Sequence, residues 1–173
     1  MHPSEVLFQG EAQPLSLPVC DHYCGSEKLM RKSLALQQEL GPVFDTTFDC
    51  EDGAAVGAER AHAEMVAQLI NSDDNRFNRV GVRIHDVGHP HWQADIDILV
   101  GDAGDRVAYV TLPKVETVGD VERTIDAVNR VAARRGIARP LPIHALVETP
   151  RAVEAAYALA SLPQLECLSF GLM

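Results

Sequence analysis

The sequence lacks any apolar run that approaches the roughly 20 residues needed to cross a bilayer. Its N-terminus also lacks the basic region followed by an apolar core that marks a secretory signal. Neither a glycine-rich phosphate loop nor the strained serine turn of a nucleophile elbow is present. Because membrane and export signals are missing, a soluble cytoplasmic protein is the simplest interpretation.

Positive charge is also scarce. Lys and Arg number 15 against 25 Asp and Glu, which gives a net charge of -10. This balance argues against nucleic acid or an anionic membrane as the main partner, although a local basic pocket for an anionic ligand stays open. The four cysteines lie mostly in apolar, strand-like segments, so we expect reduced thiols and no disulfide framework. They are Cys20, Cys24, Cys50 and Cys167.

The chain length suits one domain. Its 173 residues are 46% hydrophobic and 23% charged, which is an ordinary globular composition. We divide the chain into an N-terminal tail over residues 1–14 and one folded domain over residues 15–173.

Strand-like and helix-like segments alternate along that domain. Strands are expected at residues 15–20, 43–48, 80–85, 107–112, 141–148 and 165–170, and helices at 27–40, 58–71, 91–100, 118–135 and 151–161. The first helix has Leu29, Ser33, Leu36 and Leu40 on one stripe. Thr117 and Asp120 have the spacing of a capping box, and Thr149 followed by Pro150 predicts the start of the last helix.

Alternation of this kind is typical of a parallel sheet with crossover helices. Two architectures fit, an open doubly wound sheet and a (β/α)₈ barrel. A complete barrel needs about 250 residues. This chain carries about five and a half βα units, so it is either a complete open sheet or part of a barrel.

Charged residues end four consecutive strands. Glu51, Arg83, Lys114 and Glu148 are separated by 32, 31 and 34 residues, about one βα unit each. Because parallel strand ends converge, we expect a site there. Glu148, Glu51 and Asp52 offer hard oxygen ligands for Mg²⁺. Arg83 can bind a substrate carboxylate, and Lys114 can stabilise developing negative charge. The alternative is a set of surface ion pairs.

Five ordered motifs resemble one family. They are Phe48-Asp49-Cys50-Glu51-Asp52-Gly53-Ala54, Val82-Arg83-Ile84, Leu112-Pro113-Lys114-Val115-Glu116, Val147-Glu148-Thr149 and Ser169-Phe170-Gly171. Together they resemble the citrate lyase β-subunit-like (CoA ester lyase) branch of the HpcH/HpaI aldolase superfamily. The resemblance implies a (β/α)₈ TIM barrel, of which this chain carries about the first five and a half units. It also implies Mg²⁺, carbon-carbon bond cleavage or formation next to a carbonyl, often in a CoA thioester, and a homo-oligomer of three or more subunits.

The resemblance also implies residue roles. Glu148 would be a metal ligand, and Arg83 would bind substrate oxygens and steady an enolate. Glu51 would lie beside them, holding metal-bound water or Arg83. Asp52 and Lys114 match the motifs, Asp52 near the metal and Lys114 near the substrate. His85 stands where relatives generally have an amide and is a candidate substrate contact.

Two departures from the family pattern stand out. The first loop, Val19 to Ser26, lacks the usual Pro-Gly turn and Arg, which weakens the expectation of CoA contacts there. The family's second metal carboxylate is an Asp shortly after the Phe-Gly motif, whereas the sequence ends at Met173. We therefore expect these residues to be the C-terminally incomplete part of a longer protein.

Our main prediction is a Mg²⁺-dependent carbon-carbon lyase or aldolase acting on a small oxo- or hydroxyacid. One alternative is a non-catalytic, regulatory barrel that binds a metal or ligand, and a weaker one is a phosphoenolpyruvate-type barrel. A minor alternative for one loop is a transition-metal site at His85, His89 and His91.

Overall fold

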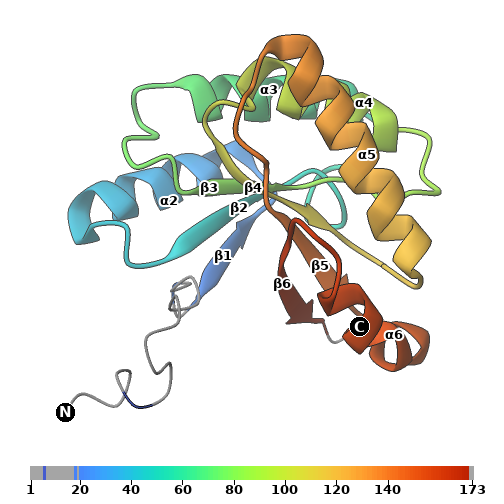
Figure 1. Cartoon of the computed structure of the whole chain (residues 1–173). Helices are drawn as coiled ribbons and strands as arrows, with labels where there is room; N and C mark the ends of the chain where they lie inside the picture. Colours follow the sequence, from blue (N-terminus) through green and yellow to red (C-terminus); the bar gives the residue numbers. More distant parts are fainter. Residues whose placement is uncertain (1–5, 7–17, 19, 172–173) are drawn as a thin grey trace.

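A computed structural model describes Val6, Pro18 and residues 20–171, in which strands and helices alternate (Figure 1). The strands are β1 (Asp21–Cys24), β2 (Asp45–Asp49), β3 (Val80–Arg83), β4 (Val107–Leu112), β5 (Ile143–Val147) and β6 (Leu165–Phe170). The helices are α2 (Glu27–Leu40), α3 (Glu59–Asn71), α4 (Trp92–Ala103), α5 (Val118–Arg135) and α6 (Pro150–Ala160).

The six strands form one parallel sheet in chain order, each strand pairing with the next. The sheet curls into a half-barrel with the helices on its outer side (Figure 1). This arrangement confirms the predicted partial (β/α) barrel and rejects the doubly wound alternative, because a doubly wound sheet carries helices on both faces. All strands run in one direction, so their carboxyl ends lie along the same edge.

The hydrophobic core lies between the outer face of the sheet and the helices. Every second strand residue points outward, and Phe48, Val82 and Val110 are fully buried there. Val66 from α3 and Ile96 from α4 are among the helix residues that cover them. Each such side chain contributes about 1.5–3 kcal/mol by leaving water.

The inner face of the sheet is polar. Thr47 donates a 2.6 Å hydrogen bond to Oδ2 of Asp21, and its hydroxyl lies 3.0 Å from that of Tyr109. The Tyr109 ring stacks on His144, with centroids 4.0 Å apart. Gly81 is required beside them, because a Cβ there would lie 2.0 Å from the Tyr109 ring. Hydrogen bonding among the strands therefore compensates for burying these polar groups.

Two predicted helix starts are confirmed in detail. The Thr117 hydroxyl accepts from the Asp120 amide, and Asp120 accepts from the Thr117 amide, which completes the capping box of α5. The Thr149 hydroxyl accepts from the Ala152 amide at 3.1 Å, with Pro150 in the first turn of α6. These caps satisfy amides that the helices themselves leave free.

The first strand differs from its prediction. Most of the predicted strand over residues 15–20 lies outside the described residues, as does most of the predicted tail. The described strand β1 falls at Asp21–Cys24, in a stretch that the sequence predicts as a loop. Asp21 suits a strand here because its side chain faces the polar inner side of the sheet, where it accepts from Thr47, whereas His22 contacts Ser33 of α2. The backbone of Asp21 is in register with that of Asp45. Tertiary pairing outweighs low strand propensity here.

Helix α2 has the predicted length and a different buried face. Its buried residues are Met30, Ser33, Leu34 and Gln37, whereas Leu29 is 45% and Leu40 57% exposed. Polar contacts turn this face of α2 toward the sheet. The side-chain amide of Gln37 donates to the Phe44 carbonyl at 2.9 Å, and the Ser33 hydroxyl lies 3.0 Å from the Cys24 sulfur. Within the described part of the chain, no helix combines the length and apolar character needed to span a bilayer.

Candidate active site at the carboxyl ends of the strands

An arginine at the end of β3 is bound by an aspartate at the end of β2. Nε of Arg83 donates to Oδ1 of Asp49 at 2.8 Å and Nη2 donates to Oδ2 at 2.5 Å. The Asp49 carboxylate also accepts from the backbone amides of Glu51 and Gly53. This bidentate contact occupies the Nε side of the guanidinium, which fixes its plane and leaves Nη1 for other partners.

Glu51 joins the two cations of the site. Its Oε2 lies 3.2 Å from Nη1 of Arg83, and its Oε1 accepts from Nζ of Lys114. Nζ of Lys114 also contacts Oδ1 of Asp52 at 3.1 Å. The Glu51 side chain is only 4% exposed, whereas that of Asp52 is 62% exposed. Glu51 is therefore the buried centre of the charge network, and Asp52 lies at its solvent side.

Glu148 is connected to the same network through backbone. The amide of Lys114 donates to Oε2 of Glu148 at 2.7 Å. Lys114 has a φ of 51°, a left-handed conformation that non-glycine residues seldom adopt. Gly171 lies on the other side of the carboxylate, where an added Cβ would be 2.9 Å from Oε1. The left-handed backbone of Lys114 and the lack of a side chain at Gly171 thus define the position of the Glu148 carboxylate.

The charges shift the protonation equilibria of the site. Burial opposes protonation of Arg83, but Asp49 and then Glu51 outweigh it and raise the pKa of Arg83. The hydrogen bond with Glu51 is the largest of the causes that raise the pKa of Lys114. Tyr23, whose ring lies 5.3 Å from the Arg83 guanidinium carbon, has its pKa raised to about 12, chiefly by burial. Arg83, Lys114 and Tyr23 therefore keep their protons at neutral pH.

His85 belongs to a neighbouring cluster. Its Nδ1 lies 2.6 Å from Oδ2 of Asp95, which also accepts from the His85 backbone amide at 2.9 Å. Its ring stacks on His89 at a centroid distance of 4.0 Å and lies 6.0 Å from the ring of His91. Among the described residues, no group of three or more His, Cys, Asp or Glu side chains is arranged to hold a metal ion. The minor histidine-metal alternative is therefore wrong for this loop.

The structure brings together five of the six predicted site residues. Glu51, Asp52, Arg83, Lys114 and Glu148 are linked by hydrogen bonds or ion pairs. Asp49, Tyr23 and Asp95 were not predicted from the sequence as site residues. The polar alternation of Asp45, Thr47 and Asp49 is the signal that points to an inward-facing Asp49. No comparable pattern in the sequence marks Tyr23.

Glu148 has the chemistry of a magnesium ligand. One of its oxygens is bound by the Lys114 amide, and no described residue donates a hydrogen bond to the other. Mg²⁺ takes one or two protein carboxylates and keeps several waters. Oε2 of Glu51 is buried and ion-paired with Arg83 at 3.2 Å but accepts no hydrogen bond from the described residues, so it can also bind a water held near the metal. Glu148 as ligand with Glu51 behind it therefore fits a hydrated Mg²⁺.

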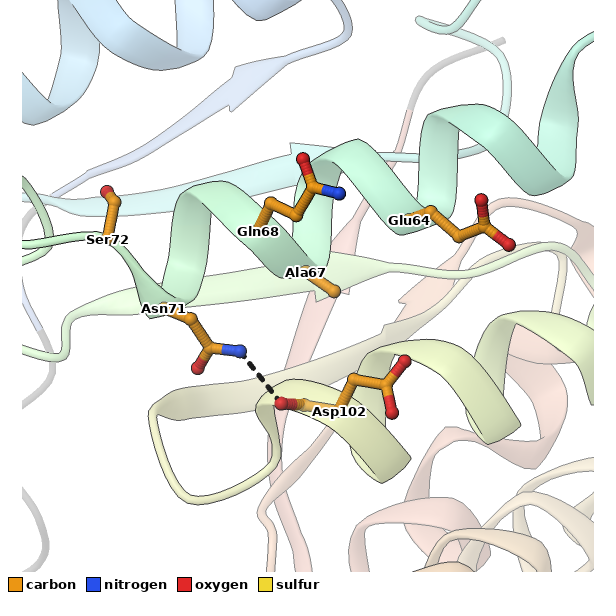
Figure 2. A pocket seen from close by; sticks show the side chains of 6 residues that line it. All are labelled: Glu64, Ala67, Gln68, Asn71, Ser72 and Asp102. Carbon is orange, nitrogen blue, oxygen red and sulfur yellow. Dashed lines mark hydrogen bonds between the residues drawn. The ribbon is translucent and has the colours of Figure 1, made fainter.

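A surface pocket of about 440 Å³ lies elsewhere, on the outer helices (Figure 2). It is lined by Glu64, Ala67, Gln68, Asn71, Ser72 and Asp102. The Asn71 side chain donates to the Asp102 carbonyl at 2.8 Å and joins α3 to α4 (Figure 2). None of the six predicted site residues lines this pocket, so it is separate from the strand-end network.

A half-barrel with a charged cluster at its carboxyl-terminal edge defines a (β/α)-barrel protein whose candidate site lies at the edge that is usual for this fold. The family model for HpcH/HpaI aldolase/citrate lyase matches residues 43–173, and the chain belongs to this family.

Several known proteins are similar to this chain. A solved citrate lyase from Burkholderia xenovorans LB400 is 53% identical with a TM-score of 0.88, over 92% of this chain and 50% of that one. The L-malyl-CoA/beta-methylmalyl-CoA lyase of Cereibacter sphaeroides is 27% identical over 71% of this chain and 39% of its own length. Protein CitE of Mycobacterium tuberculosis, solved with magnesium and acetate, shares the fold at 21% identity, with a TM-score of 0.63 over 90% of this chain and 55% of that one. This chain therefore spans about two fifths of that malyl-CoA lyase and about half of those solved chains.

Proposed function

We propose that this protein contributes the site of a Mg²⁺-dependent carbon-carbon lyase that acts on a small oxo- or hydroxyacid as a CoA thioester. The observation that carries the proposal is the connected set of Glu148, Lys114, Glu51 and Arg83 at the strand ends. It combines a carboxylate with a free oxygen and two cations that stay charged. Family membership and the names of the relatives support the same chemistry.

Cleavage next to a carbonyl leaves an electron pair on carbon, so the site must stabilise an enolate. Glu148 would hold Mg²⁺, which supplies Lewis-acid polarisation of a substrate oxygen when bound. Arg83 would donate its remaining N–H groups to substrate oxygens, because Asp49 occupies its Nε side. Glu51 keeps Arg83 and Lys114 in place, and Asp52 holds Lys114 from the solvent side.

Lys114 would add positive charge close to the substrate. Its Nζ is held between two carboxylates, so it is oriented before a ligand arrives. Preorganised charge of this kind lowers the reorganisation needed when negative charge develops. We further propose a cytoplasmic homo-oligomer, a trimer or larger, in line with the resemblance.

The test uses the purified protein with Mg²⁺ and L-malyl-CoA, the compound in the name of the Cereibacter relative. Release of an oxo acid, followed by NMR, is the expected result, and chelation of Mg²⁺ should stop it. Calorimetric titration of Mg²⁺ in the presence of acetyl-CoA or oxaloacetate measures binding separately.

The same pair of measurements tests the non-catalytic alternative. Its supporting observation is that Asp49, Glu51 and Asp52 are paired internally with Arg83 and Lys114. Ligand and Mg²⁺ binding without any turnover of thioesters or oxo acids would favour this regulatory barrel over the lyase.

A further inference from the structure

We propose that His85 is the proton-accepting base of this site and that Asp95 is the residue that positions it. The inference rests on the proposed lyase function, because a base is required only where a hydroxyl or C–H proton is removed. Neither the family match nor the relatives' names identify a base.

The geometry is that of a histidine oriented by a buried carboxylate. Oδ2 of Asp95 accepts from both the backbone amide of His85 and its Nδ1. Two contacts to one oxygen hold the ring in a single orientation and place a proton on Nδ1. No described residue forms a hydrogen bond with Nε2 of His85, so this nitrogen is available as an acceptor. The Asp95 side chain is 2% exposed and that of His85 9% exposed.

His85 lies two residues beyond Arg83, the last residue of β3 and a member of the charged network. Ile84 extends the strand, since its amide donates to the Thr111 carbonyl at 3.2 Å, and its side chain is fully buried against the helices. Continued alternation therefore starts the side chains of Arg83 and His85 on the same side of the chain, and the imidazole then reaches Asp95 in the first turn of α4. A substrate bound by Arg83 would lie next to the imidazole.

The other titratable groups at this edge are committed elsewhere. Asp49 and Glu51 are ion-paired with Arg83, and Glu51 and Asp52 with Lys114. Burial raises the pKa of the Cys50 thiol well above its ordinary value, so it stays protonated. The imidazole of His85, in contrast, is bound to Asp95 through Nδ1 only, and none of the described residues forms a hydrogen bond with its Nε2.

Several titratable groups surround His85 and Asp95. Arg83 precedes it on β3, Cys50 approaches from β2, and His89 and His91 lie in the loop before α4. Glu59, at the start of α3, lies 3.8 Å from Nε2 of His91. Burial raises the pKa of Asp95, while its bonds from His85 and the charges of His85 and His91 oppose that rise. The bonds from His85 thus favour the ionised form of Asp95 against the effect of burial.

The proton transfer balances without any further reactant. In the cleavage direction, Nε2 accepts the proton of the substrate hydroxyl while the adjacent carbon-carbon bond breaks. The oxygen becomes the carbonyl of the departing oxo acid, and the electron pair of the broken bond becomes the enolate of the thioester. The enolate carbon then takes that proton back from Nε2, which restores the neutral imidazole, and no oxidation or reduction occurs.

The test follows exchange of the acetyl-CoA methyl protons with D₂O, which requires enolisation but no bond cleavage. In the purified protein with Mg²⁺, NMR should detect exchange whose rate falls at acid pH. His85→Gln should lower the rate about 100-fold or more. Mg²⁺ binding, measured by calorimetry, should be unchanged. Asp95→Asn should move the acid limb by about one pH unit or more toward lower pH, since a negative neighbour favours the protonated imidazole.

The matched control is His144→Gln, which removes another buried histidine, 2.9 Å from a carboxylate oxygen of Glu166. His144 lies on the polar inner face with Tyr109, and replacing it should leave the pH dependence of the exchange rate unchanged. An exchange rate in the His85→Gln variant equal to that of the unaltered protein would show that His85 is not the base. An unmoved acid limb in Asp95→Asn, with the fold intact by circular dichroism, would overturn the positioning role. Absence of exchange in the unaltered protein would instead count against the lyase function itself.

Discussion

The backbone amide of Lys114 donates a 2.7 Å hydrogen bond to Oε2 of Glu148, although the two residues lie on different strand-end loops. The same Lys114 uses its side chain to bind Glu51 and Asp52. One residue in a left-handed conformation thus connects the carboxylate that we assign to Mg²⁺ with the network around Arg83.

Glu148→Gln should abolish most Mg²⁺ binding. The amide keeps the shape and the bond from Lys114 but removes the negative charge that a hard cation requires. We expect the affinity to fall about 100-fold or more, beyond the loss seen when only a supporting residue is changed. The control is Glu154→Gln on the exposed face of α6. Equal calorimetric affinities of the two variants would remove Glu148 from the metal site.

Gly171→Ala should weaken the same site without touching any charge. The new Cβ would lie 2.7 Å from Cγ of Glu148 and 2.9 Å from Oε1, so the carboxylate must move. Mg²⁺ affinity should fall about tenfold, as for other changes that misplace a ligand.

Gly119→Ala in the first turn of α5 is the control for the glycine substitution, because its Cβ would meet only the Thr117 hydroxyl at 3.7 Å. Affinity that stays unchanged in Gly171→Ala would mean that Glu148 tolerates the displacement and is not a metal ligand in this position.

Arg83→Met should destabilise the fold. It leaves the carboxylate of Asp49, 3% exposed, without the cation that binds it, and takes one of two cations from that of Glu51, 4% exposed. Removing one partner from a buried ion pair costs about 3–5 kcal/mol in the free energy of unfolding. Urea denaturation measures this loss of stability. The control is Arg60→Met, because the Arg60–Glu64 pair is exposed and an i, i+4 pair contributes only about 0.3–0.5 kcal/mol. Similar losses in both variants would contradict the buried network.

Asp120→Asn should make the free energy of unfolding change less as the pH falls into the acid range. Partial burial opposes ionisation, but the bonds from Thr117, Arg123 and the Glu116 amide outweigh it and lower the pKa of Asp120 below 3.8. A carboxyl with a lowered folded-state pKa stabilises the fold above its unfolded value and loses this contribution as pH falls through the folded value.

The difference in unfolding free energy between the original protein and Asp120→Asn should therefore be about 0.5–1 kcal/mol at neutral pH and shrink below about pH 4. Chemical denaturation at several pH values measures it. Asp126→Asn, exposed in the middle of α5, is the control and should show no such trend. A difference that grows on acidification would contradict the capping role of the Asp120 charge.

Agreement between sequence and structure is highest where local signals are strong. β4 at Val107–Leu112, β6 at Leu165–Phe170 and α5 at Val118–Arg135 have their predicted bounds. Each has clear periodicity or an explicit cap. β1 and the buried face of α2 were predicted wrongly, because polar partners in neighbouring elements decide them.

The sequence by itself determined the βα order, the charged strand ends and the family motifs, because these depend on spacing along the chain. Only the tertiary structure decided how the charges pair. The Nε side of Arg83 is engaged by Asp49, Glu51 is shared between two cations, and His85 turns to Asp95. The physical reason is that pairing energies depend on distance and burial across strands about 30 residues apart in sequence, which no local pattern records.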